Sequence, residues 1–161
     1  MEVSLKDPIA LQQIRRRFPK LAVEGFEVTS VPDRRYNCIS WAVGEKERWS
    51  WPADCFYWPT GVERNASLSA FAAFFARCGY IPCDSRDPEV ECEKVALYVG
   101  RDYLVLHAAR QLQDGRWTSK LGSSFDIAHS LTGLEGPEYG FVAQILKRPV
   151  RSVRERRAFC P

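Results

Sequence analysis

Cys38 is the residue of this sequence whose position best suits it for chemistry. It lies in a short segment, residues 36–44, that reads as a helix stopped by a glycine. The first turn of a helix offers free backbone amides and the positive end of the helix dipole, which favour a thiolate over a thiol. Cys38 is therefore either a nucleophile or a buried core residue, because free cysteine also packs like a small apolar side chain.

A thiol nucleophile needs a base, and the chain contains two histidines, His107 and His129. His107 falls within a predicted strand that would hold its ring rigidly, so we predict that it pairs with Cys38. His129 falls three residues after Asp126 in a predicted short helix, where a local ion pair would explain it. A further polar group would orient the imidazole, and three candidates stay open: Ser119, Asp126 and Asn37.

Besides the short helix within residues 36–44, two helices and one strand are expected before the main sheet. The first helix is capped by Asp7 and ends near Pro19, and the second is opened by Ser67 and closed by Gly79. Between them, residues 26–31 alternate apolar and polar side chains, which predicts a strand.

Apolar runs separated by turn signals predict the rest of the sheet. We expect a three-stranded meander, a short helix and a last strand, over residues 94–99, 103–112, 117–121, 126–134 and 139–146. This order predicts an α+β fold in which an antiparallel meander sheet packs against N-terminal helices. A length of 161 residues, of which 45% are hydrophobic, suits one domain. We place that domain at residues 1–147 and a basic tail at residues 148–161.

The segment of residues 45–62 is rich in aromatic side chains and interrupted by prolines, so it reads as an ordered loop. Trp51, Tyr57 and Trp58 of this loop, together with Trp41, are candidate substrate-binding residues. The other interpretation is that these aromatic rings cap a small core, which is the commoner role.

Several classes of function have little support in the sequence. The cysteines at 78, 83 and 92 lack the paired spacing of zinc sites, and no phosphate-binding glycine motif occurs, so no metal and no cofactor is expected. A net charge of +3 lies mostly in the tail, which makes nucleic acid an unlikely partner. No signal peptide and no membrane span are indicated, so we expect a cytoplasmic protein with no membrane contact. The oligomeric state stays open.

A cysteine that opens a helix, followed by an antiparallel meander that carries a histidine, resembles the papain-like NlpC/P60 superfamily of cysteine peptidases and amidases. The resemblance covers about residues 36–121. It rests on the order Cys38, His107 and Ser119, with Asn37 where that family usually has aspartate. It implies a papain-like fold and a hydrolase in which His107 takes the proton of Cys38. The thiolate would then attack an amide or thioester carbonyl of a peptide or protein substrate.

Residues 36–42 (YNCISWA) and 107–122 (HAARQL to WTSKLG) also resemble an uncharacterised family of small bacterial proteins. That resemblance carries no assigned reaction. The alternative function is therefore a non-catalytic protein-binding module, in the toxin, immunity or phage-related setting that such a family suggests. A hydrolase needs a solvent-reachable Cys38 with a lowered pKa and an imidazole in reach, whereas a binding module needs neither.

Overall fold

A single antiparallel sheet organises the molecule. The computed structural model describes residues 5–150 of the chain. Within this range the sheet has seven strands in the order β1-β6-β5-β4-β3-β7-β2, and every neighbouring pair is antiparallel. The strands are β1 (Phe26–Ser30), β2 (Ile81–Cys83), β3 (Cys92–Val99), β4 (Val105–Gln111), β5 (Trp117–Lys120), β6 (Asp126–His129) and β7 (Phe141–Pro149). The predicted α+β class is confirmed.

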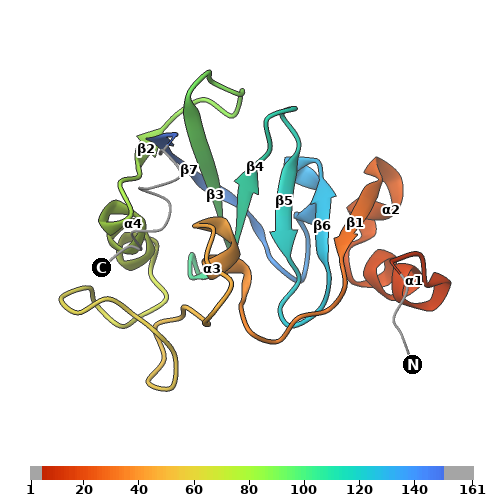
Figure 1. The fold of residues 1–161 in the computed structure, drawn as a ribbon, viewed down its shortest axis with the longest axis horizontal. Coiled ribbons are helices and arrows are strands. Elements are labelled where there is room, and N and C mark those ends of the chain that lie inside the picture. The colour runs from red at the N-terminus through yellow and green to blue at the C-terminus, as the bar shows by residue number, and fades with distance from the viewer. Residues whose placement is uncertain (1–4, 151–161) are drawn as a thin grey trace.

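Short helices surround this sheet, as Figure 1 shows. α3 lies across β4 and β5, α4 lies toward the β2 end, and α1 and α2 lie beside β1. The helices are α1 (Pro8–Arg17), α2 (Pro19–Glu24), α3 (Cys38–Ala42), α4 (Leu68–Arg77) and a 3-10 turn, η1 (Leu131–Leu134). Each face of the sheet is thus covered by helices or by the long loops between them.

The two faces of the sheet build two separate hydrophobic cores. On the face covered by α3 and α4, which we call the α3 face, Leu97 and Ala108 pack with Cys38 and with the phenylalanines of α4. On the opposite face, which we call the α1 face, Tyr98 and Ala109 pack with residues from α1, α2, β6 and η1. Successive residues of a strand point to opposite faces, so neighbours such as Leu97 and Tyr98 enter different cores.

The sequence located several elements correctly. Ser67 caps α4 by accepting a hydrogen bond from the amide of Ala70 at 3.1 Å, and the helix gives way to a turn at Cys78 and Gly79. β3, β4 and β5 form the expected meander, and β1 lies where alternation placed a strand. Local patterns were sufficient here because caps, turns and alternation all favour the same structure.

The predicted helix over residues 126–134 was wrong. Its first half is β6, a fully buried strand between β1 and β5, and only its second half turns, as η1. The spacing of three between Asp126 and His129 suggested one helix face, but in a strand these residues point to opposite faces. Four buried residues joined to strands on both sides gain ladder hydrogen bonds that a short exposed helix would lack.

The start of the predicted basic tail belongs to the sheet. β7 continues through Arg148 and Pro149, and Arg148 donates hydrogen bonds to Glu93 at 2.8 Å and to the carbonyl of Cys78 at 2.9 Å. The remainder of the predicted tail, from residue 151 on, lies outside the described residues. In the part of the chain that is described, none of the helices has the length and apolar character needed to cross a membrane.

Candidate functional site

Asn37 fixes the start of α3 through its own side chain. Its carbonyl oxygen accepts hydrogen bonds from the amides of Ser40 and Ser50, both at 3.2 Å, and its amide donates to the carbonyl of Ser50 at 2.9 Å. These contacts cap the helix and join it to the loop that follows. The predicted role of Asn37 in orienting an imidazole therefore has no contact to support it, because its side-chain oxygen and nitrogen are hydrogen-bonded to backbone atoms of Ser40 and Ser50.

The thiol of Cys38, the first residue of α3, points toward the sheet. Its side chain belongs to the α3-face core, and the residue is only 7% exposed. Burial raises the pKa of this thiol to about 11, because an apolar surrounding disfavours the thiolate. The amides of Ala108, Ile39 and Cys38 itself oppose this rise in pKa, as does the charge of Lys120, but they do not outweigh burial. The thiol is thus held in its protonated, unreactive form.

His107 lies on the α1 face, across the sheet from Cys38. Its ring stacks on Tyr139 with centroids 4.0 Å apart and meets Tyr98 edge-on. Ala108, the next residue of β4, belongs to the core that holds Cys38. No hydrogen bond joins the Cys38 thiol to a histidine in the described part of the chain. The predicted pairing of Cys38 with His107 is therefore not formed, because the side chain of β4 that faces α3 is that of Ala108.

Ser119 instead joins the two histidines into one buried chain. Its hydroxyl lies 2.9 Å from Nε2 of His107 and 2.7 Å from Nε2 of His129, and Nδ1 of His129 lies 2.6 Å from the carbonyl of Ser130. Of the three candidates for orienting His107, Ser119 is the one in contact with it. Ser119 and both histidines are at most 1% exposed, so the chain lies in the α1-face core.

The carbonyl of Ser130 fixes the direction of every hydrogen bond in this chain. Because a carbonyl only accepts, Nδ1 of a neutral His129 carries the proton and its Nε2 accepts from the Ser119 hydroxyl. Ser119 must then accept from Nε2 of His107, which leaves Nδ1 of His107 as an acceptor. That buried nitrogen has no hydrogen-bond partner among the described residues.

Burial keeps both imidazoles neutral. It lowers the pKa of His129 to about 4, although the hydrogen bond to the Ser130 carbonyl works in the other direction. It also lowers the pKa of His107 well below the usual value, and the nearby His129 adds to this effect. A positive charge on either ring would be costly in this core.

The aromatic loop mostly caps the α3-face core. Trp58 stacks on Phe74 with centroids 4.9 Å apart, and Trp51 meets Phe71 edge-on at 5.3 Å. The ring of Tyr57 lies under the guanidinium of Arg48 at 3.4 Å. These three aromatic residues do not line the pocket that Trp41 lines, so the sequence-based grouping of all four is not reproduced.

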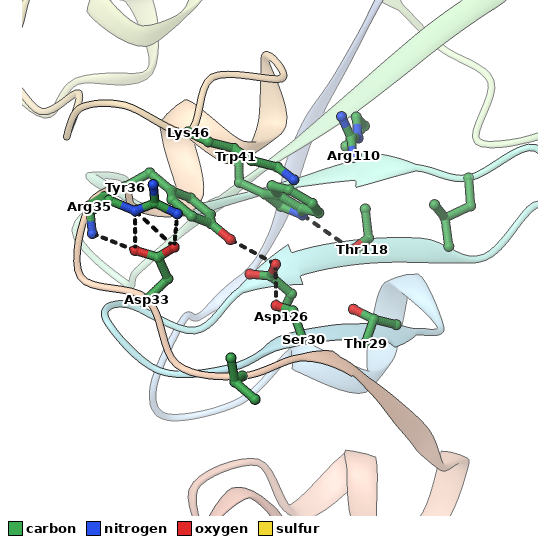
Figure 2. Close-up of a pocket in the computed structure, with 12 residues that line it drawn as sticks. Thr29, Ser30, Asp33, Arg35, Tyr36, Trp41, Lys46, Arg110, Thr118 and Asp126 are labelled. Carbon is green, nitrogen blue, oxygen red and sulfur yellow. Dashed lines mark hydrogen bonds and ion pairs between the residues drawn. The ribbon is translucent and has the colours of Figure 1, made fainter. Parts of the chain in front are cut away.

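Trp41 lines a pocket of about 420 Å³ on the α3 face. Figure 2 shows this pocket, which we call the Trp41 pocket. Its lining comes from the end of β1, from the chain around α3 and from β4, β5 and β6: Thr29, Ser30, Val31, Asp33, Arg35, Tyr36, Trp41, Lys46, Arg110, Leu112, Thr118 and Asp126.

Two cations lie against the indole of Trp41. The guanidinium of Arg110 is 4.7 Å and the ammonium of Lys46 is 5.0 Å from the ring centroid. Nε1 of the indole donates to the hydroxyl of Thr118 at 3.2 Å, which fixes the orientation of the ring. Among residues 5–150, neither cation has a carboxylate within 4.0 Å.

Asp126 carries a buried carboxylate at the floor of the same pocket. Its Oδ2 accepts hydrogen bonds from Ser30 at 2.6 Å and Tyr36 at 2.9 Å (Figure 2). Its Oδ1 is buried without a hydrogen-bond partner in the described residues. Burial lowers the pKa of the neighbouring Lys120, and the negative charges of Asp126 and Asp33 oppose that decrease. The carboxylate of Asp126 thus lies on the α3 face, where its hydrogen bonds are to Ser30 and Tyr36 and not to His107.

Sequence reasoning found Trp41 and Asp126 but did not connect them, and it missed Arg110 and Lys46. Arg110 lies 69 positions after Trp41 in the chain, so only the packing of α3 on β4 brings the two together. The alternation of β4 was a usable signal, because it places Arg110 on the face opposite to His107. The described residues contain no cluster of three or more side chains suited to hold a metal ion.

The fold and the pocket define an α+β protein with one antiparallel sheet and a charged, aromatic pocket on one of its faces. The chain belongs to the family described as a domain of unknown function, DUF7689, whose model matches residues 27–147. The match includes α3 and every residue that lines the Trp41 pocket. The comparison with curated proteins found no match, and neither did the comparison with solved structures.

Proposed function

We propose that this protein is a non-catalytic binding module that holds a short segment of a partner protein in the Trp41 pocket. The observation that carries the proposal is the presence of Arg110 and Lys46, both without an acidic partner, on one ordered indole. Such cations beside an aromatic wall are typical of recognition surfaces, where arginine and tryptophan contribute much of the binding energy.

The state of Cys38 also favours binding over catalysis. A thiol hydrolase needs an accessible thiolate with a base in contact, whereas burial raises the pKa of Cys38 to about 11 and the sheet separates it from His107. The hydrolase stays a second candidate because of one feature. His107 is oriented through Nε2 by Ser119 and keeps a free acceptor at Nδ1, as a general base would.

We expect peptides to perturb Trp41 selectively in NMR spectra. The probes are six acetylated tripeptides. Five are amidated and have glutamate, glutamine, lysine, phenylalanine or phosphoserine as the central residue, and the sixth is Ala-Ala-Ala with a free C-terminal carboxylate. At least one of them should shift the indole N–H signal of Trp41 in a saturable way and remain uncleaved. Trp41→Ala lacks this indole, so binding to the variant and to the parent protein is compared at the backbone amide signal of Thr118, which also lines the pocket. The substitution should weaken binding by about tenfold, the usual order for a tryptophan at the centre of an interface.

The indole signal of Trp51 provides the matched control, because that ring packs on Phe71 and does not line the pocket. It should not move during the titration. The melting temperature of Trp41→Ala should be compared with that of the parent protein, so that lost binding is not confused with lost folding. If none of the six peptides shifts Trp41, or if a peptide is cleaved and Cys38→Ala abolishes the cleavage, the binding-module proposal is wrong.

A further inference from the structure

The Trp41 pocket has an imbalance of charge that identifies the class of its ligand. Asp33 is paired with Arg35 at 2.7 Å, and Asp126 lies near the buried Lys120. The positive charges of Arg110 and Lys46 have no comparable compensation within the described chain. The pocket therefore holds an excess of positive charge on the side where it borders Trp41.

Arg110 has already lost much of its hydration. Burial lowers the pKa of this guanidinium, and the nearby groups Tyr80, Glu93 and Asp126 oppose the decrease. None of the ion pairs within 4.0 Å in the described residues includes Arg110. A partly buried cation without a partner gains more from a ligand anion than a fully hydrated surface cation does, because its desolvation has already occurred. Its planar guanidinium can also donate two parallel hydrogen bonds to one carboxylate.

The two acids of the pocket limit how much negative charge a ligand can carry. Asp126 and Asp33 both line the pocket within its volume of about 420 Å³. They repel a doubly charged phosphate more strongly than a singly charged carboxylate. The unpartnered Oδ1 of Asp126 is in addition an acceptor suited to an N–H group, which a peptide backbone supplies.

We infer that the Trp41 pocket binds a peptide carboxylate through Arg110 and Lys46, the two cations that lie against the indole of Trp41. This inference rests on the binding function proposed above and names its ligand. The carboxylate has two possible sources, an acidic side chain or the C-terminus of the partner chain. Both present the same singly charged, planar group to Arg110.

Four acetylated peptides separate these two sources when their binding is followed at the indole N–H signal of Trp41. Ala-Glu-Ala amide is compared with Ala-Gln-Ala amide for the side chain, and Ala-Ala-Ala acid with Ala-Ala-Ala amide for the C-terminus. We expect at least one acid to bind about tenfold more tightly than its neutral counterpart, as the loss of one charge-assisted hydrogen bond predicts. Raising the salt concentration should weaken it.

Arg110→Gln should remove that tenfold advantage, and Lys46→Gln should reduce it. Arg101→Gln is the matched control, because Arg101 is an exposed arginine outside the pocket and should leave affinity unchanged. The inference is overturned if neither acid exceeds its neutral counterpart, or if Arg110→Gln keeps the preference while folded. In that event, saturable binding of any peptide would leave the binding function standing, whereas the absence of a shift with every peptide would overturn both proposals.

Discussion

Lowering the pH from about 7 to about 5 should destabilise this protein by about 2 kcal/mol for His129 alone. The pKa of His129 is about 4 in the folded protein against 6.5 for a free imidazole. Below about pH 6.5, His129 therefore binds a proton in the unfolded chain but stays neutral in the folded chain. The free energy of unfolding falls with decreasing pH until the folded pKa is reached. The full loss is about 3 kcal/mol, and His107 adds a loss of the same sign.

Urea unfolding at a series of pH values would measure this effect. The window above about pH 5 separates the histidines from carboxylates such as Asp33 and Glu89, whose lowered pKa values matter at more acidic pH. The double variant His107→Gln, His129→Gln should show an almost flat pH dependence, even if its stability is lower at every pH. Should that variant not fold, NMR of the parent protein provides the test. Protonation of either ring in the native protein near pH 6 would contradict the prediction.

Cys38 should react with iodoacetamide at least about 100-fold more slowly than an unstructured cysteine at neutral pH. A pKa of about 11 instead of 9.0 reduces the thiolate fraction by about that factor, and burial reduces access further. Mass spectrometry after short exposures would assign the labelled positions. Cys55, which is exposed, serves as the internal reference for a reachable thiol.

His107→Ala should leave the labelling rate of Cys38 unchanged, since the two side chains lie on opposite faces of the sheet. Unfolding in urea should make Cys38 and Cys55 label at similar rates, which would show that burial protects the thiol. Labelling of Cys38 ahead of Cys55 in the native protein, lost in His107→Ala, would favour the hydrolase over the binding module.

The sequence predicts those parts of this molecule that depend on neighbours along the chain. The short helix within residues 36–44, the start of α4 at Ser67 and the β3-β4-β5 meander all follow from local patterns. The contact of Ser119 with His107 was also within reach, because adjacent strands bring such residues together.

The sequence does not reveal which face of the sheet each functional side chain occupies. The interpretation of Cys38 as a nucleophile relied on its place at a helix start. Its distance from His107, however, depends on which residues of β4 face α3, and the sequence does not show this. The Trp41 pocket is assembled from β1, α3, β4, β5 and β6, so no single segment contains its pattern. The helix expected at residues 126–134 added to the difficulty, because it placed Asp126 and His129 on the same side.

The four residues of β6 decide how polar groups are divided between the two sides of the molecule. Asp126 points into the charged Trp41 pocket, whereas His129 points into the apolar core with His107. A shift of β6 by one residue against β5 and β1 would exchange these destinations, placing a carboxylate in the apolar core and an imidazole in the pocket. Because a carboxylate buried in the apolar core would cost free energy, the side chains of this short strand fix its register against β5 and β1.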